Sequence, residues 1–347
     1  MRNALGLMLA SVVAAVVIAG VWFWTSSPRA DAAAPQTVAA RAADPLPAQA
    51  AKPAKDDVDV TAALSKRAEA APAPAPAPAP VAAAPKAACA NPDALGVSRT
   101  VVVDTTGGPG FGFLQYKQFD FLTDKEVLLT FDDGPWPTTP AVLKALADEC
   151  TKAVFFPIGL HTTYHPDILR QVAAAGHTIG AHTWSHAHLA SKKLSEQQAK
   201  DEIEKGFSAV KMALGSNPAP FFRFPALAHT PATQAYLGTR NIAMFSVDVD
   251  SNDFKSSSAE QVIQNVMTKL DKQGKGIILM HDLQKHTAQA LPTLLRRLKA
   301  GGYKVVAMRA KTTLETLPEY DAMMVKNEKV PTASSRPVGS VVQTVSD

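Results

Sequence analysis

Carboxylates and imidazoles recur in short clusters from Asp132 onward. Asp132 and Asp133 are adjacent, and His182 and His186 lie four positions apart. Two imidazoles at this spacing can meet one metal ion, and one carboxylate completes a set of three ligands that leaves positions open for water and substrate. A metal lowers the pKa of a bound water towards about 7, so the second carboxylate could deprotonate it. The pattern predicts metal-assisted hydrolysis of an acyl bond.

Further titratable residues extend this hypothesis. His281 closes an apolar run and could protonate a leaving group if a carboxylate such as Asp253 holds it as imidazolium. Arg223 could pair with any of the carboxylates. Each feature has an ordinary alternative, namely a turn at Asp132–Pro135, exposed histidines on a helical turn, or a satisfied core histidine. Because those alternatives would all have to coincide, we interpret the cluster as one active site.

The clusters follow short apolar runs that alternate with amphipathic segments between about residues 91 and 317. Continuous apolar runs are typical of strands buried on both faces of a parallel sheet, and catalytic groups of β/α folds lie where strands end. We expect an α/β fold, a (β/α) barrel of about seven strands, with an open doubly wound sheet as the alternative. The expected strands are Val127–Phe131, Ala153–Pro157, His177–Ala181, Phe221–Phe224, Ile242–Val247, Gly276–Met280 and Lys304–Met308. The expected helices are Thr138–Glu149, Pro166–Ala175, Glu196–Leu214, Pro231–Thr239, Ala259–Lys272 and Ala288–Ala300.

The N-terminal region has a different composition. An apolar run from Ala4 to Trp24 is about twenty residues long, which suits a membrane span, whereas Ala30-Asp31-Ala32 resembles a signal-peptide cleavage site. Residues 1–24 are therefore a membrane anchor or a cleaved signal peptide, and both place the rest of the chain outside the cytoplasm. Residues 25–88 are rich in Ala and Pro, which predicts a disordered, extended linker. We expect residues 89–317 to form the catalytic domain and residues 318–347 a C-terminal tail.

Overall composition excludes several classes of function. The 347 residues carry a formal net charge of only +4 without a dense Lys/Arg block, so we expect no nucleic acid partner. No GxGxxG or Walker loop follows an apolar run, so we expect no nucleotide cofactor. Cys89 and Cys150 are too few for a Cys-rich zinc or iron–sulfur site. In an exported protein they favour one disulfide over two buried thiols.

From about Lys125 to Met308 the sequence resembles the polysaccharide deacetylase family, carbohydrate esterase family 4. Five motifs carry the resemblance: TFDDG at Thr130–Gly134, HTWSH at His182–His186, RFP at Arg223–Pro225, DSNDF at Asp250–Phe254 and LMH at Leu279–His281. It implies a distorted (β/α) barrel and metal-dependent removal of N- or O-acetyl groups from polymers such as peptidoglycan, chitin or xylan.

The resemblance also implies roles for individual residues. Asp132 would be the general base, oriented by Arg223, and Asp133, His182 and His186 would bind the metal. His281 would be the general acid, with its pKa adjusted by Asp253. Leu279 would line the acetyl pocket, and the backbone N–H of Ala226, after Pro225, would donate to the oxyanion. Zn²⁺ suits a His₂Asp site best, although Co²⁺, Ni²⁺ or Mn²⁺ could serve. The chain departs from the family pattern at Ala226-Leu227, where an aromatic residue and Gly are usual, and at Phe254, where Trp is usual.

We therefore predict an exported metal-dependent deacetylase of acetylated glycans, periplasmic or in the cell envelope and attached to the inner membrane if residues 4–24 are retained. Peptidoglycan or chitooligosaccharide is the expected substrate. Trp136, Trp184 and Tyr164 could stack on sugars or simply pack in the fold. The alternatives are an O-acetyl esterase of the same family, a non-haem iron oxygenase, a glycosidase and a non-catalytic wall-binding module. His161, His165, His177 and His188 have no assigned role.

Overall fold

A computed structural model describes residue 89 and residues 91–326. They belong to one compact unit, Ala82–Asp347, whereas a second unit, Met1–Val81, lies wholly outside the described part. The predicted membrane or signal segment, the Ala/Pro linker and residues 327–347 are thus outside it. No helix among the described residues is long and apolar enough to cross a membrane.

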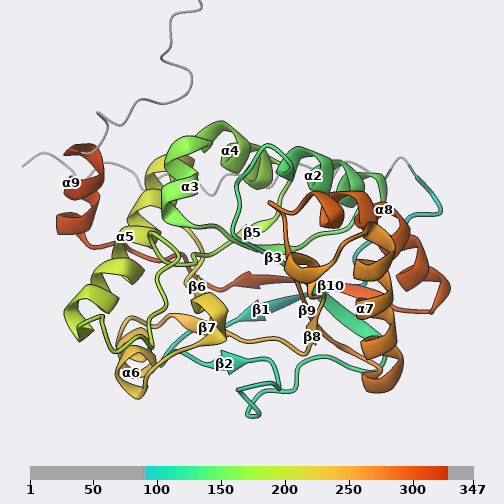
Figure 1. Cartoon of the computed structure of the whole chain (residues 1–347), viewed down its shortest axis with the longest axis horizontal. Coiled ribbons are helices and arrows are strands. Elements are labelled where there is room, and N and C mark those ends of the chain that lie inside the picture. The colour runs from blue at the N-terminus through green and yellow to red at the C-terminus, as the bar shows by residue number, and fades with distance from the viewer. Residues whose placement is uncertain (1–88, 90, 327–347) are drawn as a thin grey trace, which may run out of the picture. The chain divides into compact units, whose positions relative to one another are not determined.

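Parallel strands form the centre of the domain, and helices lie around them (Figure 1). One sheet has the order β1-β10-β3-β4-β5, with β9 pairing with both β3 and β8, and a smaller sheet has the order β2-β7-β6. The strands are β1 (Arg99–Val103), β2 (Gly110–Phe111), β3 (Glu126–Asp132), β4 (Val154–Phe156), β5 (Thr178–Ile179), β6 (Phe221–Phe222), β7 (Ala243–Phe245), β8 (Val249–Asp250), β9 (Gly276–His281) and β10 (Lys304–Ala310). The helices are α2 (Thr139–Asp148), α3 (Gly159–Tyr164), α4 (Pro166–Ala174), α5 (Glu196–Leu214), α6 (Pro231–Thr239), α7 (Ala259–Gln273), α8 (Lys285–Ala300) and α9 (Pro318–Lys326).

The two sheets continue into each other. A parallel bridge joins Ala181, just beyond β5, to Phe222 of β6. On the other side, β7 leads within a few residues into β8, which pairs with β9, and β9 pairs with β3. The path β3-β4-β5-β6-β7-β8-β9 therefore returns to β3, and this arrangement is consistent with the predicted (β/α) barrel.

Alternation along β3 explains how the barrel presents polar groups inside. Val127, Leu129 and Phe131 pack in the larger apolar cluster, which includes the buried faces of the helices, whereas Leu128 packs in a second cluster with Phe156. Since side chains alternate along a strand, Thr130 and Asp132 follow the face of Leu128. The sequence of β3 thus directs Asp132 to the barrel interior at the strand's last residue.

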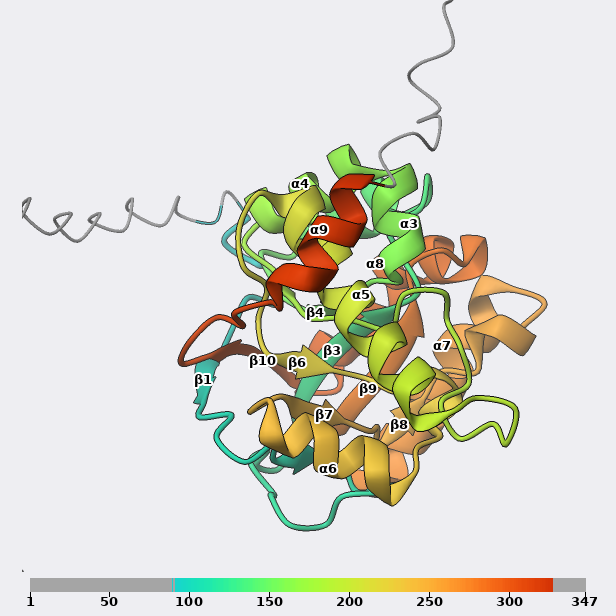
Figure 2. The ribbon, with the colours of Figure 1, turned by 90° about the vertical axis from the view of Figure 1, so that its left-hand side faces the viewer.

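Each predicted strand and helix is present, but some elements were not predicted. Strand β1 was not predicted, although it contains the apolar run Val101–Val103. Strands β2 and β8 are two residues long, which is too short for a detectable period, and α3 lacks an apolar repeat. Helix α9 occupies the start of the segment expected to be a tail. It lies along α5, where Tyr320 and Met324 are buried and Lys211 pairs with Asp321 at 2.9 Å (Figure 2).

The predicted disulfide between Cys89 and Cys150 is confirmed, with a Cα–Cα distance of 5.9 Å. It fastens the start of the domain to the end of α2, and the backbone N–H of Gly96 also donates to the Glu149 carbonyl at 2.8 Å. The N-terminal segment of the domain is thus held both covalently and by hydrogen bonds.

Replacing both cysteines with serine should lower the free energy of unfolding by about 3–4 kcal/mol, because the cross-link closes a long loop in the unfolded chain. The sequence separation of the two cysteines is 61 residues. Denaturant titration of the double variant beside the parent protein measures the difference. Equal unfolding free energies would show that the cross-link does not stabilise the domain.

Candidate active site

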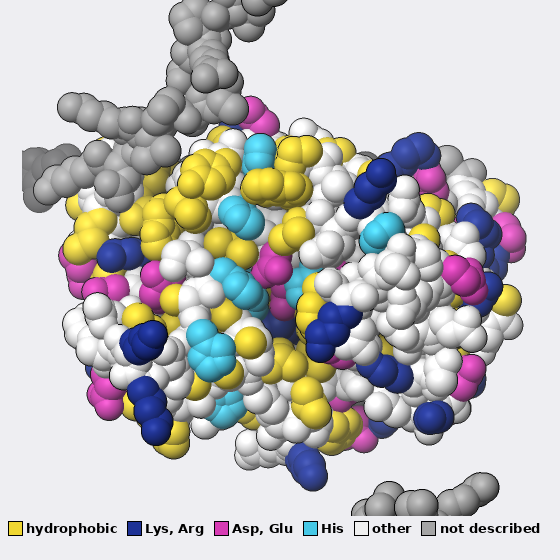
Figure 3. All heavy atoms as spheres, viewed as in Figure 1, with side chains coloured by type: hydrophobic (Ala, Val, Ile, Leu, Met, Phe, Trp, Pro, Cys, Tyr) yellow, Lys and Arg dark blue, Asp and Glu magenta, His cyan; other side chains and the backbone are white. Residues whose placement is uncertain are grey.

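The motif residues meet at the ends of the barrel strands. Asp132 ends β3 and lies beside His281, which ends β9, in the parallel register of the two strands. Histidine and acidic side chains gather at a hollow in the middle of the face seen in Figure 3. Five chain segments that are far apart in sequence thus contribute to one rim, as expected for a β/α fold.

Asp133, His182 and His186 form the cluster that was predicted to bind a metal. The Oδ1 atom of Asp133 lies 3.5 Å from Nε2 of His182 and 3.4 Å from Nε2 of His186. The three candidate ligand atoms lie within 4.8 Å of one another. The segment from His182 to His186 is a loop and not a helical turn, so the histidines converge through backbone bends, with His186 at φ 61°.

These residues fit a divalent cation. Oδ1 of Asp133 is buried and has no hydrogen-bond partner among the described residues. The carbonyl of Arg223 can only accept, so Nδ1 of His182 donates to it at 2.6 Å and Nε2 keeps its lone pair. Burial lowers the pKa of His182 despite the neighbouring carboxylates, which favours the neutral ring that binds metal.

A buried ion pair holds Asp132. Nη1 of Arg223 donates to Oδ1 of Asp132 at 2.7 Å and to Oγ1 of Thr130 at 2.8 Å. Nη2 donates to the carbonyl of Ser246 at 3.1 Å, and the guanidinium lies 4.5 Å from the centre of the Phe156 ring. Arg223 has no exposed surface. The second oxygen of Asp132 is left facing the metal cluster, with Oδ2 at 3.9 Å from Nε2 of His182.

His281 faces this group from β9 and is oriented by Asp253. Nδ1 of His281 lies 2.6 Å from Oδ1 of Asp253, and the backbone N–H of His281 donates to Oδ2 at 2.7 Å. Thr287 donates to the same Oδ2 at 2.5 Å. Burial disfavours the charged imidazole, but the hydrogen bond and charge of Asp253 outweigh it and raise the pKa of His281 to about 9. Its free Nε2 points to the site, 3.9 Å from Oδ2 of Asp133.

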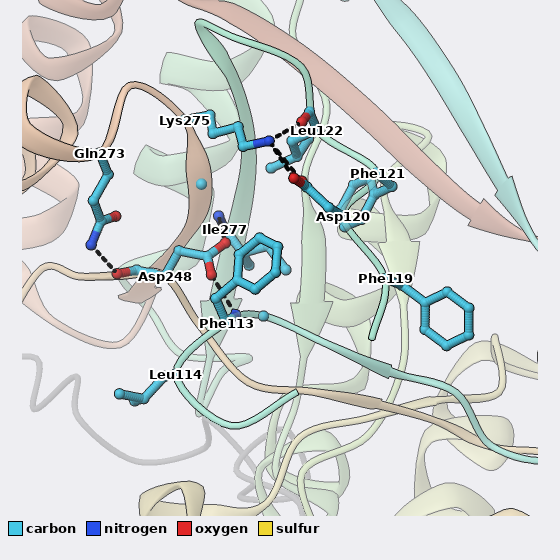
Figure 4. Close-up of a pocket in the computed structure, with 12 residues that line it drawn as sticks. Phe113, Leu114, Phe119, Asp120, Phe121, Leu122, Asp248, Gln273, Lys275 and Ile277 are labelled. Atoms are coloured by element: carbon cyan, nitrogen blue, oxygen red, sulfur yellow. Dashed lines mark hydrogen bonds and ion pairs between the residues drawn. The ribbon is translucent and has the colours of Figure 1, made fainter. Parts of the chain in front are cut away.

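Two other aspartates follow β7, and neither belongs to the metal-ligand cluster. Asp248 accepts hydrogen bonds from the backbone N–H groups of Phe113 at 2.6 Å and Ile277 at 2.7 Å. It lines a cavity of about 400 Å³ near the start of β9, at the other end of that strand from His281 (Figure 4). Asp250 accepts from the backbone N–H of Asn252 at 2.8 Å.

The residues proposed to contact substrate differ in exposure. Leu279 is buried on β9, and Phe254 is half exposed with its ring 5.7 Å from that of His281. Pro225 begins a short 3-10 turn in which Ala226 has φ 52°. Trp136 is exposed.

Trp184 is only partly exposed, and its ring lies against Gly159, where a Cβ atom would come within 3.0 Å of it. Its backbone carbonyl accepts a hydrogen bond from Leu160 at 2.8 Å. Trp184 thus packs against α3.

Sequence reasoning assigned no role to two residues of this rim, His161 and Asp282. Nδ1 of His161 donates to the backbone carbonyl of Asp133 at 2.6 Å, and its ring packs 4.9 Å from that of Trp136. Asp282, directly after His281, is fully buried, and burial raises its pKa to about 7. No motif marks either residue, because each acts through contacts between elements distant in the chain.

The polysaccharide deacetylase family matches residues 121–243. The chain carries a polysaccharide deacetylase domain. It is 34% identical over 187 residues to the peptidoglycan-N-acetylglucosamine deacetylase PgdA of Listeria monocytogenes, covering 54% of this chain and 38% of that protein. It is 34% identical over 166 residues to chitin deacetylase 1 of Saccharomyces cerevisiae, covering 46% of this chain and 53% of that protein.

Among solved structures, the deacetylase domain resembles a peptidoglycan deacetylase of Bdellovibrio bacteriovorus, with a TM-score of 0.56, 34% identity, and coverage of 62% of this chain and 59% of that one. The matched part of the chain thus spans well under two thirds of each of these three relatives. The family, and not the activity of a whole relative, is what the match establishes.

Replacing Asp253 with Asn should lower the pKa of His281, because burial then acts without the opposing carboxylate charge. In the metal-free parent, the imidazole should deprotonate near pH 9, and in the variant at a distinctly lower pH. Because the folded-state pKa lies above the ordinary value of 6.5, stabilisation by this pair is complete below about pH 6.5 and is lost as the pH rises through 9.

NMR titration of the histidine ring protons measures the shift, with His229, which packs against Tyr116 and Phe224, as an internal control. An unchanged titration of His281 in the Asp253→Asn variant would contradict the assigned coupling.

Proposed function

We propose that this chain is an exported, metal-dependent deacetylase that hydrolyses N-acetyl groups of N-acetylglucosamine-containing glycans, either peptidoglycan or chitooligosaccharide. The observation that carries the proposal is the meeting, at one rim, of the Asp133, His182 and His186 cluster with an oriented carboxylate and an oriented imidazole. The printed functions of the Listeria and yeast relatives support the glycan class. Export rests on the apolar run at residues 4–24, which lies outside the described residues.

Asp132 is the proposed general base. Its Oδ1 is engaged by Arg223, so the carboxylate is fixed in orientation while Oδ2 remains available to take a proton from water. The neighbouring Asp133 faces the two histidines instead. Two adjacent carboxylates therefore have separate roles, one in proton transfer and one in ligation.

Asp133, His182 and His186 would hold the ion, for which Zn²⁺ is our first choice. A divalent ion supplies Lewis acidity there, which makes water more acidic and polarises a carbonyl oxygen. The backbone N–H of Ala226 is the proposed second donor to the carbonyl oxygen.

His281 is the proposed general acid. Its raised pKa keeps the imidazole protonated at neutral pH, and Asp253 fixes the ring so that Nε2 faces the site. Departure of an amine from an amide requires a proton more strictly than departure of an alkoxide from an ester. The arrangement therefore favours an N-acetyl over an O-acetyl substrate.

Replacing Asp132 with Asn should lower kcat for acetate release by about 100-fold to 10,000-fold, because the base is lost. Zinc affinity, measured by isothermal titration, should stay close to that of the parent protein. Asp248→Asn is the matched control, since Asp248 is a largely buried aspartate outside the site. Full acetate release by the Asp132→Asn variant would contradict the base assignment, and saccharide binding without acetate release by the parent would favour a wall-binding module.

An aromatic patch beside the metal ligands is the proposed platform for sugar. Trp136 and Tyr164 are both exposed. The centre of the His161 ring lies 4.9 Å from that of Trp136 and 6.4 Å from that of Tyr164. His161 is hydrogen bonded to Asp133, so the patch adjoins the cluster. Rigid apolar ring faces suit stacking on a sugar next to the acetylated one.

Replacing Trp136 with Ala should raise KM for an N-acetylglucosamine oligomer about tenfold, which corresponds to roughly 1.4 kcal/mol of lost stacking. Hydrolysis of a small acetyl ester, which has no neighbouring sugar, should change little. Phe113→Ala, which removes an exposed ring at the distant cavity, is the control. An equal loss on both substrates would argue against a sugar platform.

A further inference from the structure

We infer that Asp282 is a positioning residue that fixes the loop carrying Asp132 and Asp133 in its working geometry. The expected effect on acetate release rests on the proposed function, whereas the packing of Asp282 against the loop does not depend on that function. Asp282 belongs to none of the five motifs and touches neither the proposed ligands' side chains nor the open part of the site.

Asp282 connects three elements that meet beneath the rim. It follows His281 at the end of β9 and is only 1% exposed. Its backbone N–H donates to the carbonyl of Asp132 at 3.3 Å. Its Oδ2 accepts from Oγ1 of Thr139, on α2, at 2.5 Å, and its carbonyl accepts from Oγ1 of Thr138 at 2.7 Å. The residue therefore joins the strand of the acid, the loop of the base and the start of α2.

Gly134, the residue after Asp133, packs directly on the Asp282 carboxyl group. A Cβ atom at Gly134 would lie 2.1 Å from Oδ2 and 2.4 Å from Oδ1 of Asp282. Gly134 is not among the residues with positive φ, so close approach and not backbone torsion requires glycine here. The loop thus packs directly against the Asp282 carboxyl group through Gly134.

The loop above this carboxyl group is bent, and several elements hold it. Nδ1 of His161 donates to the Asp133 carbonyl at 2.6 Å, and the N–H of Ile158 donates to the Gly134 carbonyl at 3.0 Å. Asp133 has φ 73°, a conformation that is unfavourable for a residue with a side chain and needs support from its surroundings. Its N–H donates to the carbonyl of Phe156 at 3.2 Å, and the N–H of Trp136 donates to Oγ1 of Thr139 at 2.9 Å. Thr139 bonds in turn to Asp282. The loop is therefore anchored at one end by Phe156 and at the other through Thr139 by Asp282.

The chemistry of Asp282 also argues against a purely packing role. Its Oδ1 is buried without a hydrogen-bond partner among the described residues. A buried polar atom left without a hydrogen-bond partner destabilises the folded state. An apolar side chain would avoid this cost but could not accept the hydrogen bond from Thr139 that anchors the loop.

The test compares Asp282→Ala with Asp282→Asn in the full, zinc-loaded chain. Asp282→Ala should lower zinc affinity and kcat for acetate release about 10-fold to 100-fold, the range seen when partners behind a metal ligand are removed, with little change in KM. Asp282→Asn keeps an oxygen for Thr139 and should restore most of both. Glu204→Gln is the matched control, because Glu204 is equally buried but pairs with Arg240 and Tyr236 away from the rim. It should lower stability only.

Gly134→Ala provides a second test, which remains informative if the single variant Asp282→Ala does not fold. Alone it should disturb the loop and weaken zinc binding, whereas adding Asp282→Ala makes room for the methyl group and should recover part of the affinity. Zinc affinity and kcat unchanged in Asp282→Ala, measured well below its unfolding midpoint, would overturn the inference. If the parent protein released no acetate while Asp282→Ala still weakened zinc binding, the proposed function would fail and the positioning role would stand.

Discussion

The ion pair between Arg223 and Asp132 is the interaction on which the rest of the site depends. A fully buried guanidinium is costly unless its charge and its N–H groups are matched. Here the two terminal nitrogens donate to the carboxylate of Asp132, the hydroxyl of Thr130 and the carbonyl of Ser246, whereas Nε is buried with no hydrogen-bond partner among the described residues. The backbone carbonyl of the same arginine orients His182. One residue therefore sets the direction of the proposed base and the tautomer of a proposed metal ligand.

The barrel makes this arrangement possible because strand alternation and parallel register place the partners at one end. Asp132 and Thr130 share the inner face of β3, and His281 lies beside Asp132 in register. The loops beyond the strands then adopt unfavourable backbone conformations at Asp133, His186 and Ala226. Such strain is stable only where the surroundings fix it, and it is common at functional sites. Hydrogen bonds from neighbouring elements and the packing of Gly134 on a buried carboxyl group provide that support.

Much of this could be predicted from the sequence. The apolar runs predicted the central strands, and the resemblance to the polysaccharide deacetylase family implied the pairs Arg223–Asp132 and Asp253–His281, which the structure forms. The short strands β2 and β8 and the helix α3 could not be predicted, because they carry no periodic signal. His161 and Asp282 were missed for another reason. Their roles arise from packing between segments far apart in the chain, and their residue types alone do not reveal it.

In the mechanism that we propose, the aspartate and two histidines at the rim support hydrolysis of N-acetyl groups. Titration of the metal-free full chain with Zn²⁺, with acetate release from N-acetylglucosamine oligomers followed at each step, tests it most directly. We predict no release without metal and a rise in activity that saturates at one equivalent of zinc per chain. Acetate release by the metal-free protein, or saturation with zinc without any release of acetate, would contradict it.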